Sequence, residues 1–345
     1  MGVIPLKNRY LIHVDNILAL TVSPLTALIA FLVYMLISPA ALALTVEDSL
    51  GSQELPAPAT RVVTLNWAAT EEVLELGVTP LGVAEIKGYK TWVTQPVIPE
   101  AVMDVGTRAE PNIERIAGLK PDLIIVGSMQ QNMIARLKPI APVLYFDNYR
   151  ADHDNFSAIK DSFQRLAVAL GKADIAKARL DAQNAKLKQL KQRLNVYFNG
   201  QLPKVTVVRF SDAHHVRAYG LNSMPLAALK ELGIEPAIAI KNSTWGQVQK
   251  PIRDLAYMKG ILLYLRPLPK EAELFQQPLF RMMPFVAEGR IAPVRSTWTY
   301  GGALSISYLA EHFVDALMTL PATIASNDHA LNSHTLDSHT SAGIK

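Results

Sequence analysis

The chain has 345 residues, of which 50% are apolar and 19% are charged, which indicates a folded body long enough for two domains. Lysine and arginine number 34 against 30 for aspartate and glutamate, and no basic tract carries interleaved aromatics, so nucleic acid is not indicated as a partner. The absence of cysteine excludes disulfides, thiolate zinc sites, iron–sulfur clusters, cysteine nucleophiles and the acylated cysteine of a bacterial lipoprotein.

Residues 1–43 are predicted to be a secretory signal. Lys7 and Arg9 form a basic start, residues 17–43 are almost uncharged, and Ala41-Leu42-Ala43 is a small-residue exit of the kind that precedes cleavage. The alternative is an uncleaved membrane anchor, because a span needs about 20 apolar residues and this run is long enough. Both interpretations place the body outside the cytoplasmic membrane, in the periplasm.

A polar leader is predicted at residues 44–60, and an α/β lobe at residues 61–152. Strand and helix patterns alternate in this lobe with short joins, which favours a mostly parallel sheet with helices on both faces. The predicted strands are 61–65, 81–84, 104–106, 122–126 and 142–146, the predicted helices are 68–76, 111–120 and 129–137, and residues 86–103 are predicted as a loop.

Residues 153–200 contain no strand candidate and are predicted to be a helical connector. One amphipathic helix is expected at 156–170, and a second runs from 172 to about 197 without proline or glycine. Its apolar residues recur at alternating spacings of three and four, with Gln183 as an interruption. A coiled coil is the alternative, but the polar break favours a long bridging helix that lies against two lobes.

Strand–helix alternation resumes at residues 201–320, which are predicted to form a second lobe. The predicted strands are 204–210, 214–219, 260–265 and 290–294, and the predicted helices are 223–232, 251–258 and 303–320. Residues 321–345 are polar and are predicted to be a disordered tail. The expected fold is therefore α/β, with two strand–helix lobes joined by one long helix and a ligand site between the lobes.

Signals for catalysis are absent from the sequence. It contains no GxSxG, GxGxxG, Walker A or HExxH motif, and no spacing singles out a catalytic triad. His214 and His215 are adjacent in a predicted strand, where neighbours point to opposite faces, so they are poorly placed to share a metal. We expect neither a catalytic residue nor a metal ligand in the chain.

Arg108 and the tryptophans are the candidate binding residues. Arg108 lies on a turn between a strand end and a helix start, where open α/β sheets hold ligands, and is expected to be a bare cation. The four tryptophans are each expected in a loop after a strand, two in each lobe: Trp67, Trp92, Trp245 and Trp298. They could pack as plugs over the core ends. Together with a guanidinium fork, however, they favour an aromatic-lined cleft for a ligand with anionic or carbonyl oxygens.

At these residues the chain resembles periplasmic ferric-siderophore-binding proteins, most closely the ferric hydroxamate binders (FhuD type) of bacterial ABC importers. The resemblance covers about residues 61–319 in collinear order. It rests on the segments RVVTLNW (61–67), YKTWV (89–93), DVGTRAEPNIE (104–114), YGLNS (219–223), TWG (244–246), MPFVAEGR (283–290) and WTYG (298–301). It implies a class III periplasmic binding protein-like fold, in which two α/β lobes are joined by one long helix and move little on binding.

The resemblance also implies roles for single residues. Arg108 would contact hydroxamate oxygens around iron, Trp92 and Trp245 would line the pocket, and Tyr300 would add a further wall. The siderophore supplies the oxygen ligands of the metal, so no cofactor is expected beyond the iron of the bound complex. Relatives carry a tyrosine in the loop after Gly127, where this chain has none, so that contact would be missing or replaced by Gln130 or Gln131.

Two acidic residues are candidates for docking to an inner-membrane ABC permease with its cytoplasmic ATPase. Glu114 matches a surface carboxylate of the first lobe that relatives present to the permease. In the second lobe this chain has Arg253 followed by Asp254 where relatives show an acid, so the second contact would be shifted to Asp254 or lost. The alternative for both acids is an ordinary solvated helix face.

The expected function is therefore capture of an iron(III)–hydroxamate siderophore by a monomeric receptor. The same architecture could instead carry a ferric catecholate or carboxylate siderophore, or a corrinoid. A carboxylate chelate should require several basic residues in the cleft, and the sequence places only Arg108 there. An extracytoplasmic hydrolase is the third alternative, for which no nucleophile–base pair is visible.

Overall fold

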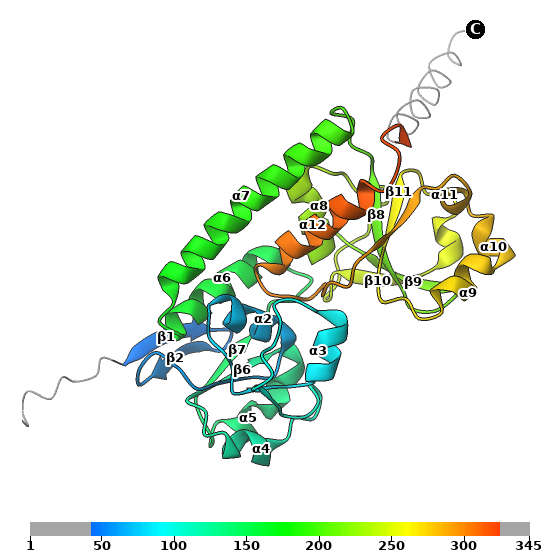
Figure 1. Ribbon diagram of the computed structural model, residues 1–345. Helices are drawn as coiled ribbons and strands as arrows, with labels where there is room; N and C mark the ends of the chain where they lie inside the picture. The colour runs from blue at the N-terminus through cyan, green and yellow to red at the C-terminus, as the bar shows by residue number, and fades with distance from the viewer. Residues whose placement is uncertain (1–42, 325–345) are drawn as a thin grey trace, which may run out of the picture. The chain divides into compact units, whose positions relative to one another are not determined.

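The computed structural model describes residues 43–324 (Figure 1). The predicted signal, apart from its last residue Ala43, and the predicted tail from residue 325 onward lie outside the described residues. Within residues 43–324, no helix combines the length and the apolar character that a membrane span would need.

The first lobe contains a five-stranded parallel sheet with strand order β5-β4-β3-β6-β7. The interior strand β6, between β3 and β7, is buried along its whole length, as expected for a continuous apolar run covered on both faces. The strands are β3 (Val62–Thr64), β4 (Gly82–Val83), β5 (Met103–Asp104), β6 (Leu123–Gly127) and β7 (Val143–Phe146). The helices are α2 (Trp67–Glu75), α3 (Ile86–Trp92), α4 (Ile113–Gly118), η1 (Ser128–Met133) and α5 (Ile134–Leu137).

The second lobe contains a mixed five-stranded sheet with strand order β10-β9-β8-β11-β12, in which β9 and β10 are antiparallel to their neighbours. The strands are β8 (Val205–Phe210), β9 (His215–Tyr219), β10 (Gln247–Pro251), β11 (Ile261–Leu265) and β12 (Ile291–Val294). The helices are α8 (Met224–Leu232), η2 (Ile252–Leu255), α9 (Glu271–Gln276), α10 (Pro278–Arg281), α11 (Pro284–Ala287) and α12 (Ser305–Leu317).

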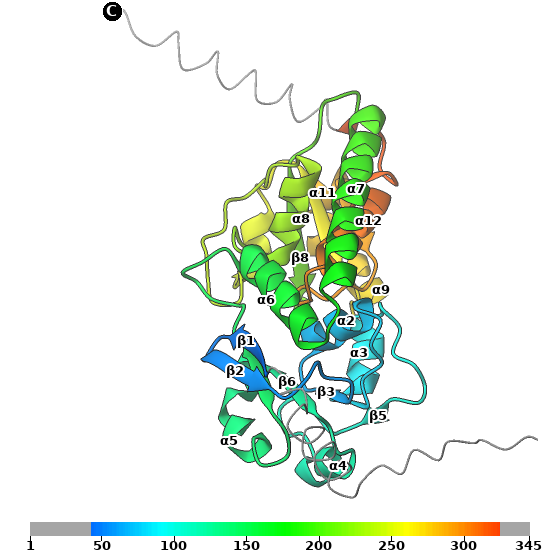
Figure 2. The same cartoon turned by 90° about the vertical axis from the view of Figure 1, so that its left-hand side faces the viewer.

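Two helices, α6 (Asn155–Ala169) and the longer α7 (Ala173–Tyr197), connect the lobes (Figures 1 and 2). The Arg179 side chain donates to the carbonyl of Glu75 in the first lobe, and Tyr197 near the other end donates to the carbonyls of Met318 and Leu320 in the second. Gln183, the polar break, is buried and donates to the carbonyl of Ala303. The helix therefore bridges both lobes, which confirms the predicted fold class.

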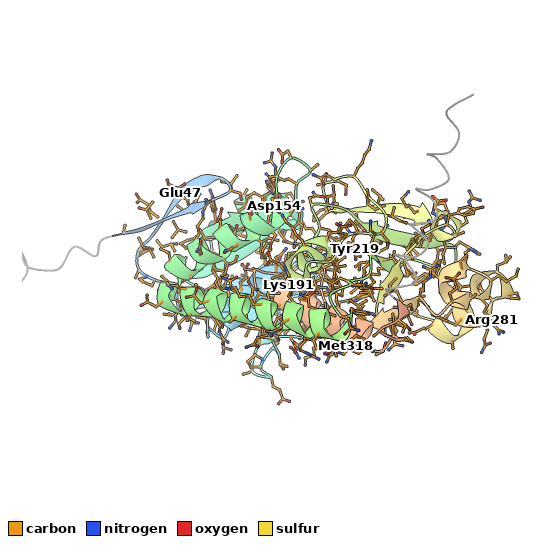
Figure 3. The ribbon with its side chains drawn as sticks, turned by 90° about the horizontal axis from the view of Figure 1, so that it is seen from above. Glu47, Asp154, Lys191, Tyr219, Arg281 and Met318 are labelled. Atoms are coloured by element: carbon orange, nitrogen blue, oxygen red, sulfur yellow. The ribbon has the colours of Figure 1, made fainter. Side chains whose placement is uncertain are left out.

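The C-terminal end of α7 is held by contacts with the second lobe. In Figure 3, Lys191 lies on α7 and Met318 lies beside the end of this helix, whereas Arg281 lies at the outer edge of the second lobe. The guanidinium of Arg193 approaches the sulfur of Met318 at 3.6 Å. Because α7 packs at both ends, it fixes the separation of the two sheets and hence the width of the space between them.

The predicted polar leader at residues 44–60 contains a hairpin that the sequence analysis does not predict, in which β1 (Leu44–Asp48) and β2 (Gly51–Leu55) pair antiparallel. Val46, Asp48 and Leu55 are buried. The Asp48 carboxylate accepts a hydrogen bond at 3.0 Å from the backbone N–H of Tyr145, which belongs to β7. The polar residues Asp48 and Gln53 occupy inward positions and so hide the apolar–polar alternation that would mark this hairpin.

The prediction of a loop at residues 86–103 is wrong, because α3 occupies its first part. Glu85 precedes this helix in the left-handed region, with φ of 60°, and offers no side-chain cap, so no sequence signal marks the helix start. The predicted helix at 251–258 is only the 3₁₀ turn η2, and β10 before it was missed since glutamines and Pro251 dilute its pattern. The sequence analysis predicts no helix or strand where α9, α10 and α11 lie.

Candidate functional site

A cavity of about 280 Å³ lies between the two lobes. It is built mainly from segments that follow the carboxyl ends of first-lobe strands and from β9, β10 and loops of the second lobe. The lining residues of the first lobe are Asn66, Ala68, Ala69, Glu72, Arg108, Val126, Gly127, Ser128, Met129, Phe146, Asn148 and Tyr149. Those of the second lobe are Arg217, Trp245, Gln247, Trp298 and Tyr300. The cavity is therefore where an inter-lobe ligand site was predicted.

Arg108 lines this cavity, but it is not the bare cation that the sequence suggests. Its Nε donates to Glu85 Oε2 at 2.8 Å, and its guanidinium carbon lies 3.5 Å from the ring centroid of Trp67 and 5.4 Å from that of Trp298. Glu85 is well placed for this pairing, because its own N–H donates to the carbonyl of Gly106 on the Arg108 turn. Within residues 43–324, no hydrogen bond reaches the two terminal nitrogens of Arg108. They remain available to a ligand.

Gln130 holds the Arg108 turn in place from the side that does not face the cavity. Its side chain is fully buried, its Nε2 donates to the carbonyl of Arg108 at 2.9 Å, and its Oε1 accepts from the N–H of Gly127 at 3.2 Å. Gln130 does not line the cavity, because its amide is engaged within the protein. The residues of this loop that do line the cavity are Ser128 and Met129.

Aromatic rings from both lobes form a continuous wall. Tyr149 and Trp245 are stacked with centroids 6.0 Å apart, and Tyr300 meets each of them edge-on at 5.4 and 5.8 Å. Trp298 then lies 5.4 Å from Tyr300 and 4.8 Å from Trp67. Trp245 is 39% exposed, so its indole forms part of the rim. The wall offers an apolar surface that edge-to-face packing holds rigid.

Trp67 and Trp92 lie outside the exposed wall. Trp67 is the first residue of α2, contrary to the expectation that all tryptophans lie in loops, and it is only 2% exposed. Its indole N–H donates to the carbonyl of Ala84, which holds the ring in place beneath the guanidinium of Arg108. Trp92 ends α3 and does not line the cavity, and the guanidinium carbon of Arg209 lies 5.1 Å from its ring centroid.

The structure thus brings Arg108, Trp245, Trp298 and Tyr300 together around one cavity, with Trp67 directly beneath Arg108. It leaves Trp67, Trp92 and Gln130 out of the lining.

The lining residues that escaped sequence reasoning include Glu72, Tyr149 and Arg217. Tyr149 follows β7, and its hydroxyl donates to the carbonyl of Gly301 in the other lobe at 3.1 Å. Arg217 alternates with buried Val216 and Ala218 in β9, a signal that identifies the exposed face of a strand but not what that face borders.

Acidic residues of α2 join the lobes beside the cavity. Glu71 accepts from the N–H of Gly302 at 3.0 Å and from the hydroxyl of Ser305, and Glu72 accepts from the N–H of Ala303 at 3.1 Å. Burial raises the pKa of the Glu71 carboxyl and that of the Glu72 carboxyl to about 8 each. Both therefore carry a proton for most of the time at neutral pH. In a sequence, such a run of glutamates indicates a solvated helix face.

The two predicted docking acids are both exposed. Glu114 lies in the first turn of α4 and has no ion-pair partner within residues 43–324. Asp254 lies in η2, which follows the end of β10 that is remote from the cavity-lining Gln247. A permease-docking role stays a prediction for both.

Metal-ligating residues do not gather in the described part of the chain, where no group of three or more histidines, aspartates or glutamates could hold an ion. His215 starts β9 and its Nδ1 lies 3.1 Å from the carboxylate of Asp212.

Comparison with known proteins gives this arrangement a context. The sequence pattern of the family described as "Periplasmic binding protein" matches residues 62–296. The iron(3+)-hydroxamate-binding protein FhuD of Escherichia coli is 31% identical over 260 residues, which cover 74% of this chain and 85% of that protein. The Fe(3+) dicitrate-binding periplasmic protein FecB of Escherichia coli is 27% identical over 76% of this chain and 86% of its own length.

The structure also resembles a solved one. The siderophore-binding protein FhuD from Vibrio cholerae, in its complex with Fe³⁺–Desferal, superposes with a TM-score of 0.74 at 40% identity. The match covers 75% of this chain and 97% of that one.

Proposed function

The chain belongs to the periplasmic binding protein family, and we propose that it captures an iron(III)–hydroxamate siderophore in its inter-lobe cavity and delivers it to an inner-membrane ABC permease. The relatives named above are binding proteins, and this chain likewise binds its ligand without catalysing a reaction on it. The lobes need to move little, because α7 and the α2–α12 contacts hold them together.

The observation that carries the proposal is the state of Arg108. Glu85 and the Trp67 ring fix its guanidinium, while its two terminal nitrogens have no partner within residues 43–324. A guanidinium fork held in this way presents parallel N–H donors to adjacent oxygens. The hydroxamate oxygens on the surface of an iron chelate are close together and electron-rich, so they match such a fork.

The aromatic wall supports the same ligand class. Trp245, Tyr149 and Tyr300 offer ring faces and edges to the methylene chains that link hydroxamate groups. Iron(III) is a hard cation that prefers oxygen ligands, and the siderophore itself supplies them. The protein therefore holds the cargo through its organic shell and provides no ligand of its own to the metal.

The family supports a proposal about location and partners. We propose that the predicted signal exports the chain to the periplasm, where it acts as a monomer, and that Glu114 contacts basic residues of the permease that works with a cytoplasmic ATPase. Asp254 is a weaker candidate, because it lies at the end of β10 away from the cavity.

The test is a titration of the purified protein with ferric hydroxamates, ferric citrate and a ferric triscatecholate, followed by tryptophan fluorescence. Trp245 and Trp298 line the cavity, so a coloured iron complex bound there should quench their emission. We expect saturable quenching at micromolar concentration or below with a hydroxamate complex. No quenching by any of several ferric hydroxamates would contradict the proposal, and tight binding of only the citrate or catecholate complex would assign the site to that siderophore class.

A further inference from the structure

A second guanidinium lines the cavity and has no counter-charge. Arg217 lies in the middle of β9, its side chain is exposed, and within residues 43–324 it forms no ion pair. Its charge acts on a lining residue of the cavity: burial raises the pKa of Tyr300, and the positive charges of Arg217 and Arg209 oppose that rise. Arg217 is therefore at the rim of the cavity and close to the aromatic wall.

The other charged groups of the cavity are compensated. The charge of Arg108 is matched by Glu85 at 2.8 Å. Within residues 43–324, Glu72 is the one acid that lines the cavity, and its carboxylate accepts from the N–H of Ala303. Its carboxyl is largely protonated at neutral pH, as described above. Among the lining residues that the structure describes, Arg217 is thus the charged group without an ion-pair partner.

Ferric trishydroxamates differ in net charge only through groups outside the iron centre. Each hydroxamate loses one proton on binding iron(III), so three of them cancel the charge of the metal. What remains is any charged group on the chain that extends from the chelate. A cavity of about 280 Å³ that opens to solvent beside Trp245 leaves such a pendant group near the rim.

Building on the proposed function, we propose that Arg217 is a specificity-determining residue that favours ferric hydroxamates with a pendant carboxylate over those with a pendant ammonium. The guanidinium attracts the carboxylate and repels the ammonium through the solvent at the rim. It is exposed, so the effect is modest and salt reduces it.

The experiment uses three ligands with one chelate: ferrioxamine B, which ends in an ammonium group, and its N-acetyl and N-succinyl derivatives, which end in a neutral group and a carboxylate. Dissociation constants are measured by fluorescence at low and at high salt for the wild-type chain and for Arg217→Gln. Arg217→Lys keeps the charge, and Arg136→Gln removes an exposed arginine of α5 that does not line the cavity.

We expect the wild-type chain to bind the succinyl derivative about tenfold more tightly than ferrioxamine B at low salt, with the acetyl derivative between them. Arg217→Gln should reduce this ratio to within about twofold, whereas Arg217→Lys and Arg136→Gln should keep it. The ratio should shrink at high salt.

Equal binding of all three ligands by the wild-type chain would overturn this inference alone. So would a preference that persists in Arg217→Gln or disappears in Arg217→Lys. Failure of all three ligands to bind would overturn the proposed function together with this inference.

Discussion

Replacing Arg108 with alanine tests the role assigned to its free terminal nitrogens. The fixed cation can donate from a terminal nitrogen to a hydroxamate oxygen, and one hydrogen bond to a charged group contributes about 1.5–3 kcal/mol. Since 1.4 kcal/mol corresponds to about tenfold in affinity, Arg108→Ala should weaken binding of a ferric hydroxamate roughly 10- to 150-fold.

The same change should leave the protein folded. The Arg108–Glu85 pair is partly exposed, with side-chain exposures of 18% and 37%, and such pairs contribute about 1 kcal/mol at most. The stacking on Trp67 contributes another ~0.5–1 kcal/mol. Together these remain well below a typical unfolding free energy of about 5–15 kcal/mol.

The assay is a fluorescence titration combined with thermal unfolding of each variant. Arg108→Lys keeps the charge but loses the planar fork and should recover only part of the affinity. Glu85→Gln keeps the fork and removes the ion pair that orients it, so its loss should be smaller than that of Arg108→Ala. An Arg108→Ala variant that is well folded and binds with unchanged affinity would refute the reasoning.

Further predictions concern stability and the wall of the cavity. Burial raises the pKa of the Glu72 carboxyl from 4.5 to about 8 in the folded chain, so the unfolding free energy should fall as pH rises through that window. Glu72→Gln has the shape of the protonated acid and does not titrate, so it should make the fall of the unfolding free energy with pH less steep by about 1.4 kcal/mol per pH unit. Equal slopes of Tm against pH in the wild-type and Glu72→Gln proteins would contradict this. Trp245→Ala should weaken binding about tenfold with little change in Tm, because its indole is a stacked ring at the rim. Trp92→Ala should lower Tm and leave affinity within about twofold, since partial burial makes its stability loss smaller than the roughly 3–5 kcal/mol of a fully buried tryptophan. A large affinity loss in Trp92→Ala would show that this indole reaches the ligand.

The fold could be predicted wherever a local pattern carries the structure. The buried strand β6 is a continuous apolar run, and α4 begins at Asn112, whose side chain accepts from the N–H of Arg115. The hairpin of β1 and β2 could not be predicted, because its inner face packs against α6 and β7, which follow it by about ninety residues or more along the chain.

The candidate site divides in the same way. Arg108 and the tryptophans stand out because an arginine on a strand–helix turn and indoles in expected loops are unusual locally. Their environment depends on distant residues: Glu85 neutralises Arg108, and Tyr149 completes the aromatic wall. Arg217 looks like any outward residue of a strand until the second lobe is placed against the first. Such pairings are set by tertiary packing, which local sequence patterns do not encode.

The most direct test of the central claim is a crystal structure of the protein with a bound ferric trishydroxamate. The account predicts that the chelate lies between Arg108 and Trp245, with hydroxamate oxygens within hydrogen-bond distance of the terminal nitrogens of Arg108 and with all iron ligands supplied by the siderophore. A chelate bound outside the inter-lobe cavity, or a protein side chain coordinated to the iron, would contradict it.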